Sequence, residues 1–211
     1  MKFDFFLKSC SKIEKIKVNT SKAHQEFTPA GRGNFSENYK TEATREAAVM
    51  AIVSPIDGIA HLTLIIRSIY DGAHSGQVAF AGGKREPEDL NLLETAYREV
   101  HEEIGVSPDN LIFLRALTSL YVPVSDFRIF PYLAYAEKKL SYIPQQSEVD
   151  QVITLPLEAL FSKETIQKTK ITLGDHSIIK VPAFVLDDYT IWGATSMILN
   201  ELKQIIVKSM Q

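Results

Sequence analysis

Apolar and polar positions follow two periods along this chain, one typical of helices and one of strands. Residues 1–17 repeat apolar side chains at spacings of three, four and seven, which predicts a short amphipathic helix. Residues 91–104 have the same period and end at Gly105, a residue type that favours helix termination. Two further helices are predicted at 157–161 and 192–208.

Shorter apolar runs between these helices predict strands. The runs AAVMAIV at 47–53 and HLTLIIR at 61–67 flank a turn sequence with Pro, Asp and Gly, so we expect a hairpin. Three more strands are predicted at 111–121, 129–137 and 149–155. Because the strands mix with a few helices without regular alternation, the sequence predicts an α+β fold with a mixed sheet.

The stretch 19–40 is polar and contains one proline and two glycines, which is typical of a loop or linker. We therefore expect an N-terminal extension over residues 1–44, consisting of a helix and a polar linker, and a main domain over residues 45–208. The chain has 211 residues, of which 45% are hydrophobic and 23% charged, so it can bury a sizeable core.

The charge balance excludes several classes of partner. With 23 Lys+Arg and 26 Asp+Glu, the net charge is −3, which provides no basic field for nucleic acid or an anionic membrane. The single cysteine, Cys10, excludes an internal disulfide and a cysteine-based zinc site. No apolar run is long enough for an export signal or for the roughly 20 residues of a membrane span. We expect a cytoplasmic protein that binds neither nucleic acid nor membrane.

The segment richest in chemistry is AYREVHEEIGV at 96–106, within a predicted helix. At about 100° per residue, Glu99, Glu102 and Glu103 fall on one stripe beside an apolar stripe, and we expect the acidic stripe to be exposed. Like charges at this spacing repel one another, and a divalent cation such as Mg²⁺ would remove the repulsion. A solvated acidic face without a ligand has the same pattern.

The run REVHEEIGV at 98–106 resembles the second half of the Nudix box, R-E-U-x-E-E-x-G-U, where U is aliphatic. Gly83 resembles the glycine that opens this box. The distance from Gly83 to Arg98 is one residue longer than usual, which places an extra residue in the loop 84–90. Asp89 is then the best counterpart of the early glutamate of the box.

The segment HSGQVAFAGG at 74–83, preceded by Arg67-Ser68, is similar to a signature of the coenzyme A pyrophosphatase branch of this family. That signature reads L-L-T-x-R-S followed by H-x-G-Q-V-A-F-P-G-G, so Ala81 stands where it has proline. The longer loop is also a feature of that branch. The resemblance covers about residues 45–202.

The resemblance implies a Nudix-type α/β/α sandwich with a mixed sheet and a hydrolase that cleaves the diphosphate of coenzyme A. The products would be 4′-phosphopantetheine and adenosine 3′,5′-bisphosphate. It implies Mg²⁺ or Mn²⁺ as the cofactor, held by Glu99, Glu103, Glu102 and the backbone carbonyl of Gly83. Glu102 is a third ligand or a base.

Further roles are assigned to residues around this helix. We expect Arg98 to hold loop carboxylates and Glu148 to act as a base or an additional ligand, with a solvated loop glutamate as the alternative. We expect the pantetheine arm of the substrate to lie along Phe80 and Tyr121. The candidate substrate-binding residues, each with a structural role as its alternative, are Arg67, His74 and Gln77.

Two other functions stay open. The substrate can be another nucleoside diphosphate derivative, such as ADP-ribose or NADH, because nothing in the carboxylate helix separates these. Alternatively, the chain can be a non-catalytic Nudix module that senses a ligand, although such a module would be expected to lose part of the glutamate cluster. A homodimer is left open as the assembly.

Overall fold

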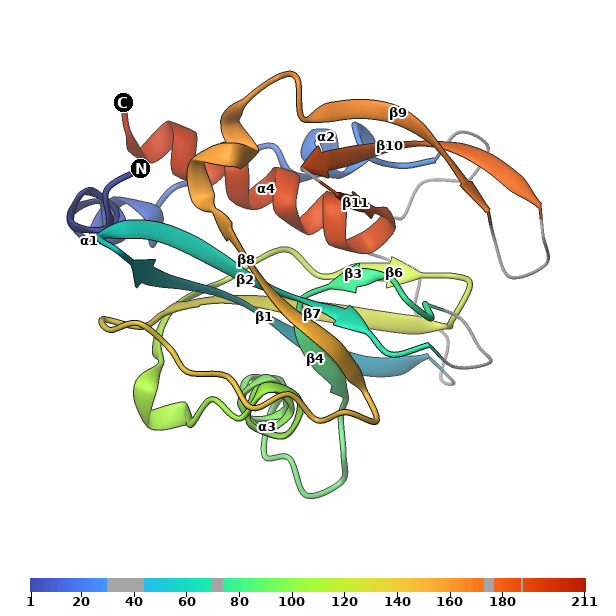
Figure 1. Ribbon diagram of the computed structural model, residues 1–211, viewed down its shortest axis with the longest axis horizontal. Helices are drawn as coiled ribbons and strands as arrows, with labels where there is room; N and C mark the ends of the chain where they lie inside the picture. The colour runs from blue at the N-terminus through green and yellow to red at the C-terminus, as the bar shows by residue number, and fades with distance from the viewer. Residues whose placement is uncertain (30–43, 70–73, 173–176, 187) are drawn as a thin grey trace.

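The computed structural model describes residues 1–29, 44–69, 74–172, 177–186 and 188–211. Within these ranges, an eight-stranded mixed sheet lies between helices on its two faces, and three further strands form a small separate sheet (Figure 1). This arrangement confirms the predicted α+β fold with a mixed sheet.

The described helices are α1 (Phe3–Ile13), α2 (Thr20–Gln25), α3 (Leu92–Ile104) and α4 (Gly193–Ser209), with 3-10 helices η1 (Pro108–Asn110) and η2 (Leu157–Phe161). The main sheet contains β1 (Arg45–Ile56), β2 (Ile59–Arg67), β3 (Val78–Ala79), β4 (Ala81–Lys84), β5 (Ile112–Ala116), β6 (Leu120–Val122), β7 (Phe127–Tyr135) and β8 (Val149–Pro156). The small sheet contains β9 (Ile166–Thr172), β10 (Ile178–Leu186) and β11 (Tyr189–Trp192). None of the described helices combines the length and apolar character needed to cross a membrane.

The centre of the main sheet is β1, which pairs in parallel with β7 and antiparallel with β2 and β4. The predicted hairpin of β1 and β2 is confirmed, and its turn is tighter than expected because the strand continues through Pro55 to Ile56. Strand β2 also pairs with β8, so the end of β2 lies beside the start of β8. These pairings place β4, the end of β2 and the start of β8 next to one another in the sheet. All three lie close to α3.

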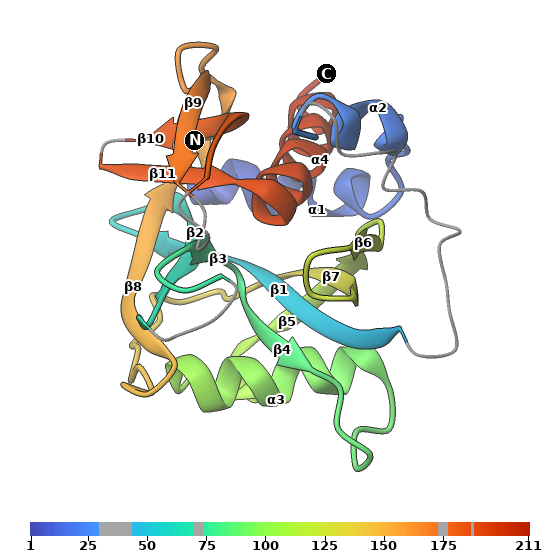
Figure 2. The same ribbon diagram turned by 90° about the vertical axis from the view of Figure 1, so that its right-hand side faces the viewer.

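Two apolar layers cover the two faces of the sheet. Helix α3 contributes Ala96, Val100 and Ile104 to one layer, all fully buried. Helices α1 and α4 contribute to the other layer, which includes Phe6 and Leu199. Figure 2 shows α3 below the sheet and α1 and α4 above it. Helices on both faces thus give the α/β/α layering implied by the resemblance.

The N-terminal segment is more structured than predicted. The stretch 19–40 was expected to be a linker, but residues 20–25 form α2, while residues 30–40 lie outside the described residues. Helix α2 contacts α4, and Phe27 just after it stacks on Phe184 at a ring-centroid distance of 4.6 Å. A polar segment with so few apolar residues has too weak a period to reveal a single short helix.

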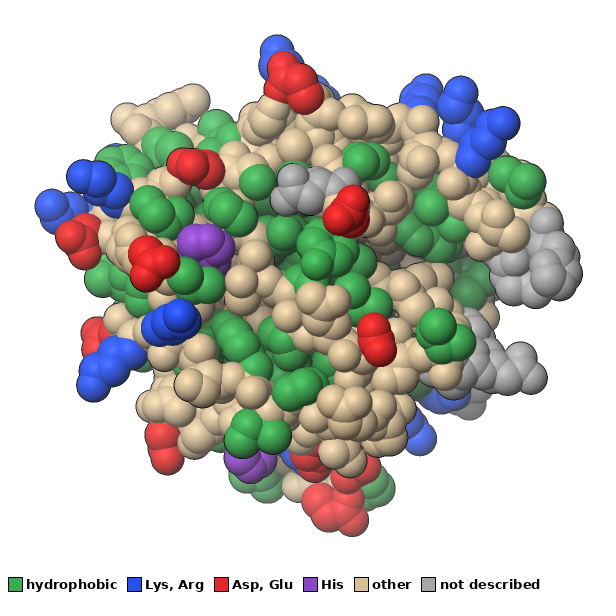
Figure 3. All heavy atoms as spheres, viewed as in Figure 1, with side chains coloured by type: hydrophobic (Ala, Val, Ile, Leu, Met, Phe, Trp, Pro, Cys, Tyr) green, Lys and Arg blue, Asp and Glu red, His purple; other side chains and the backbone are tan. Residues whose placement is uncertain are grey.

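Other elements also differ from the prediction. The strand predicted at 111–121 is divided into β5 and β6, and the helix predicted at 157–161 is a 3-10 helix. Strands β9, β10 and β11 were not predicted, because lysines and threonines interrupt β9, Pro182 lies within β10, and β11 has only four residues. Figure 3 shows basic side chains gathered at the upper right, over the hairpin of β9 and β10. In that hairpin, Lys170 lies directly opposite Lys180.

The packing of α1 leads to a first prediction. Replacing Phe6 by alanine should lower the free energy of unfolding by about 3–5 kcal/mol, because its ring is fully buried against Phe3 and Tyr135. The control is Phe5→Ala in the same helix, where 45% of the residue is exposed and the change should be below about 1 kcal/mol. Urea unfolding of both variants measures the difference, and equal losses would contradict this packing.

Candidate active site

Helix α3 supplies most of the candidate residues, and local interactions fix both its ends. The side chain of Asn91 accepts hydrogen bonds from the N–H groups of Leu93 and Glu94, which satisfies donors that the first helical turn leaves free. The helix ends at Gly105, whose φ of 70° is in the left-handed region. The predicted boundaries of 91–104 are therefore confirmed to within one residue.

Three carboxylates converge beside this helix. Side-chain oxygens of Glu99, Glu103 and Glu148 lie within 4.8 Å of one another. The first two come from successive turns of α3, and Glu148 comes from the loop that leads into β8. The structure thus brings together two of the predicted metal ligands and the loop glutamate.

The helical wheel places Glu102 on the same stripe, but among the described residues Glu102 does not belong to the cluster of Glu99, Glu103 and Glu148. Its side chain is 56% exposed and forms an ion pair with Arg98 at 2.8 Å. The side chain of Glu103 is only 1% exposed, so the expectation of an exposed acidic stripe is wrong for this residue. The difference arises because β4 and β2 approach α3 on the side of Glu103, where the Gly82 N–H and Arg67 reach its carboxylate.

The cluster is electrostatically costly as a set of charged groups. The pKa of Glu103 is raised to about 7, chiefly by burial, and the neighbouring carboxylates Glu99 and Glu148 act in the same direction. A hydrogen bond from the Gly82 N–H at 2.8 Å and the guanidinium of Arg67 at 3.6 Å act in the opposite direction. Burial also raises the pKa of Glu99. A cation among these oxygens would offset both the burial and the repulsion.

Gly83 is in close contact with the cluster. A Cβ atom at this position would lie 2.5 Å from a carboxylate oxygen of Glu99, so any side chain would displace that carboxylate. Gly83 therefore allows the Glu99 carboxylate to lie directly against the backbone of β4. The role of its carbonyl oxygen as a metal ligand stays a prediction.

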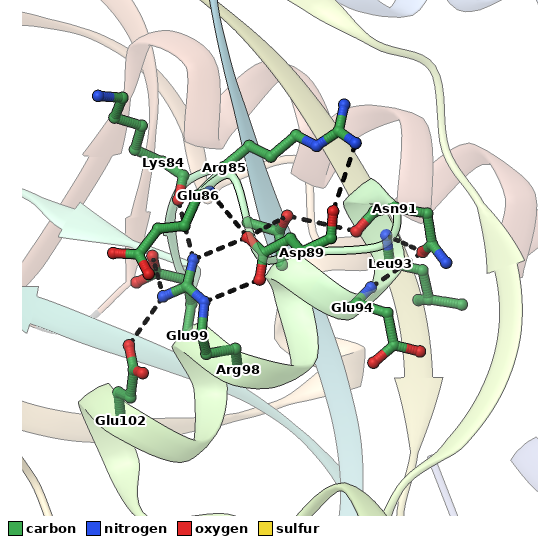
Figure 4. Close-up of polar contacts among 11 residues, drawn as sticks. Lys84, Arg85, Glu86, Asp89, Asn91, Leu93, Glu94, Arg98, Glu99 and Glu102 are labelled. Carbon is green, nitrogen blue, oxygen red and sulfur yellow. Dashed lines mark hydrogen bonds and ion pairs between the residues drawn. The ribbon is translucent and has the colours of Figure 1, made fainter.

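Arg98 connects the loop before α3 to the helix (Figure 4). Its Nε and Nη2 atoms donate to the two carboxylate oxygens of Asp89, each at 3.0 Å, and Nη2 also donates to the Lys84 carbonyl. Its Nη1 atom donates to Glu99 and Glu102. This matches the geometry expected of Arg98, since the guanidinium pairs with a loop carboxylate through two parallel hydrogen bonds.

Asp89 is the centre of that loop. Besides Arg98, it accepts hydrogen bonds from the hydroxyl of Thr95 at 2.8 Å and the N–H of Glu86 at 2.9 Å. The hydrogen bonds from Arg98 hold the pKa of Asp89 well below its ordinary value. Thr95 was not singled out from the sequence. The signal that could have identified it is a threonine in the first turn of the helix, six residues after Asp89.

The loop that carries Glu148 is attached to the end of α3. The N–H of Ile143 donates to the carbonyl of Ile104, and the N–H of Gln145 donates to the carbonyl of Glu103, both at 2.9 Å. The last carbonyls of a helix have no partner within the helix, so these bonds satisfy groups that would otherwise be free. They also fix the distance between the Glu148 loop and the two helical carboxylates.

The candidate substrate residues lie near the end of β2. Arg67 faces Glu103, while the Arg67 N–H donates to the carbonyl of Gln77 at 3.1 Å. His74 Nδ1 lies 3.1 Å from Gln77 Oε1, so these two side chains are also adjacent. Phe80 is 2% exposed within the core on the α4 side, so the expectation that it lines the substrate arm is wrong.

A model of the NUDIX domain matches residues 44–176 of this chain. Human mitochondrial coenzyme A diphosphatase NUDT8 is 31% identical over 163 residues, which span 76% of this chain and 69% of that protein. An uncharacterized Nudix hydrolase, NudL, from Pectobacterium atrosepticum is 30% identical over 162 residues, or 75% of this chain and 81% of the relative. Because one relative is named as mitochondrial, the cytoplasmic location stays a prediction.

Solved structures of similar fold include the Nudix hydrolase RenU from M. smegmatis, with a TM-score of 0.55 and 16% identity over 82% of this chain and 93% of that chain. A MutT/nudix family protein from Enterococcus faecalis has a TM-score of 0.53 and 15% identity, covering 82% of this chain and 66% of that chain. At this level of identity the likeness concerns the fold alone.

The Asp89 contacts give a prediction about stability and pH. A carboxyl whose pKa is lowered on folding stabilises the fold above its unfolded-state pKa of about 3.9, and this contribution is lost as the pH falls through the folded-state pKa. Asp89→Asn should therefore lower the free energy of unfolding by about 2–3 kcal/mol at neutral pH. The difference from the wild type should shrink progressively below about pH 4.

Denaturant unfolding over a pH series tests this, with the exposed Asp109→Asn as the matched control. A difference between wild type and Asp89→Asn that does not change down to strongly acidic pH would contradict the ion pair as its source.

Proposed function

Because the chain belongs to the Nudix family of diphosphate-hydrolysing enzymes, we propose that its substrate is coenzyme A or a coenzyme A derivative. Water attacks one phosphorus of the diphosphate, a new P–O bond forms, and the bond from that phosphorus to the bridging oxygen breaks. The products are 4′-phosphopantetheine and adenosine 3′,5′-bisphosphate. The observation that carries the hydrolytic chemistry is the cluster of Glu99, Glu103 and Glu148, whose carboxylate oxygens lie within 4.8 Å of one another.

The cluster fits a hard divalent cation. All its side-chain donors are carboxylate oxygens, which suit Mg²⁺ or Mn²⁺, and a bound cation would remove the repulsion among three carboxylates that lie within 4.8 Å of one another. We assign Glu99, Glu103 and Glu148 as the residues that hold the ion, with the backbone of Gly83 beside them. When bound, such an ion screens the diphosphate charge and lowers the pKa of the attacking water.

Glu148 has a second proposed role besides holding the ion, and the residues around the cluster have roles of their own. Glu148 accepts the proton of the attacking water, because it is the exposed member of the cluster. Glu102 is the alternative base, but its ion pair with Arg98 directs it away from the cluster. Arg98 orders the loop, and Arg67 binds the diphosphate, because it already lies next to Glu103. His74 and Gln77 extend this substrate contact from the adjacent loop.

The substrate assignment rests on two supports of different kinds. The segment HSGQVAFAGG at 74–83 resembles the coenzyme A branch signature, and the relative NUDT8 is named as a coenzyme A diphosphatase. Coenzyme A carries a 3′-phosphate that ADP-ribose lacks. A site for that phosphate would favour coenzyme A through charge-assisted hydrogen bonds.

Removing the charge of Glu103 should abolish metal-dependent turnover and leave the fold intact. Glu103→Gln should lower kcat by about 10²-fold or more, while its amide oxygen can still accept the hydrogen bond from Gly82. The measurements are Mn²⁺ binding by electron paramagnetic resonance and hydrolysis in Mg²⁺ after chelator treatment. Glu94→Gln, an exposed position on the same helix, is the matched control.

The same assay separates the two candidate bases. Glu148→Gln should reduce kcat far more than Glu102→Gln, because only Glu148 lies in the cluster. The opposite order would make Glu102 the base. Hydrolysis that persists after thorough removal of divalent ions would eliminate the metal-dependent mechanism.

A substrate panel tests the proposed specificity. We expect kcat/KM for coenzyme A to exceed that for 3′-dephospho-coenzyme A by about 10- to 150-fold, the effect of one charge-assisted hydrogen bond. Arg67→Ala should lower kcat/KM for both substrates alike, because Arg67 lies at the diphosphate end of the site. Chromatographic separation of the products identifies the bond that is cleaved.

ADP-ribose and NADH complete the panel and address the other functions. A clear preference for either would assign the chain to another nucleoside diphosphate substrate. An absence of hydrolysis across the panel, with Mn²⁺ binding intact, would favour a ligand-sensing module.

A further inference from the structure

The loop that carries Glu148 is attached on a second side, to the residue that follows β2. The hydroxyl of Ser68 donates to the carbonyl of Gln146 at 3.1 Å. The N–H of Ser68 donates to the carbonyl of Glu148 at 2.9 Å. One residue therefore contacts two backbone positions of the loop, including that of Glu148 itself.

A β-bulge lies next to these contacts. Ile66 pairs with Gln151, whereas the following residue Arg67 pairs with Val149, so Asp150 is left as the extra residue of β8. Residues directly opposite each other in an antiparallel pair lie on the same face, and side chains alternate along each strand. Bulges of this kind re-aim side chains and are frequent next to active sites.

The shift changes which residues face α3. Without the extra residue, Arg67 would pair with Asp150, and Val149 would point to the opposite face of the sheet. With the bulge, Val149 is fully buried in the layer beneath α3. Glu148 is then the first residue beyond the ladder, opposite Ser68 and beside the helical carboxylates.

Glu148 needs such support because electrostatics opposes its position. It is exposed, and its carboxylate lies within 4.8 Å of those of Glu99 and Glu103, a distance at which like charges repel. Repulsion favours any movement of the loop that takes Glu148 away from its neighbours, and a fixed backbone opposes that movement. The hydrogen bonds from Ser68 provide this hold from the β2 side, opposite those from the end of α3.

We propose that Ser68 is a positioning residue that, with the bulge at Asp150, holds Glu148 within reach of Glu99 and Glu103. This inference rests on the role of Glu148 in the proposed function. The bonds of Ser68 to the carbonyls of Gln146 and Glu148 are the contacts that support this role, so Ser68 would act through Glu148.

The test uses the full chain and the variants Ser68→Ala and Ser68→Thr. Ser68→Ala should weaken Mn²⁺ binding by about three- to tenfold and lower kcat to a similar extent with little change in KM, which corresponds to one lost hydrogen bond. Ser68→Thr keeps the hydroxyl and should restore both values. Ser54→Ala is the matched control, because Ser54 is buried in β1 and its hydroxyl has no hydrogen-bond partner among the described residues.

A double-mutant cycle with Glu148→Gln decides how Ser68 acts. If Ser68 works through Glu148, Ser68→Ala should have no further effect on Mn²⁺ affinity when Glu148 is already glutamine. Equal effects in both backgrounds would overturn the proposal. A loss of unfolding free energy in Ser68→Ala with unchanged Mn²⁺ affinity would do the same, because that is the result of a purely structural role.

The outcomes for this inference and for the proposed substrate are separable. Mn²⁺ binding needs no substrate, so an enzyme that prefers ADP-ribose would refute the coenzyme A assignment and leave the Ser68 result standing. If Glu148→Gln changes neither Mn²⁺ affinity nor kcat, the role of Glu148 fails and the inference about Ser68 fails with it.

Discussion

A carboxylate that is 1% exposed, as Glu103 is, has lost nearly all of its hydration, and this loss is the main cause of its raised pKa. The fold tolerates the group because the Gly82 N–H and the guanidinium of Arg67 face it. Gly82 belongs to β4 and Arg67 to the end of β2. The charge of Glu103 is therefore tolerated only when these strands pack next to α3. The Gly82 N–H and the Arg67 guanidinium compensate the negative charge of Glu103 only in part, and the proposed cation would supply the remaining positive charge.

Arg98 determines which carboxylates are available to bind the proposed cation. It draws Glu102 outward and pairs with Asp89 in the loop, while sharing Glu99 with the cluster. One guanidinium thus separates the acidic residues of this region into a group that orders the loop and a group that converges. Its pKa is raised chiefly by the hydrogen bond to Asp89, so its charge is permanent across the accessible pH range.

The parts of this structure that depend on neighbouring residues could be predicted from the sequence. Helix α3 was recognised from its apolar period and from the glycine that ends it, and the β1–β2 hairpin from its two apolar runs. The distinction between buried Glu103 and exposed Glu102 could not be predicted, because a helical wheel places both on one stripe. It depends on strands that reach α3 from elsewhere in the chain, as does the approach of Glu148.

The contacts of the N-terminal segment with α4 have a consequence for biosynthesis. Phe6 and Phe27 belong to the same apolar layer as Leu199 and Leu202, although all the strands lie between the two pairs in the sequence of the described elements. Until α4 is released, these phenylalanines have no complete surface to bury against, and the nascent chain exposes apolar groups that favour aggregation. The apolar layer between α1 and α4 can therefore be completed only once α4 has been synthesised, and until then this face is a surface on which chaperones can act.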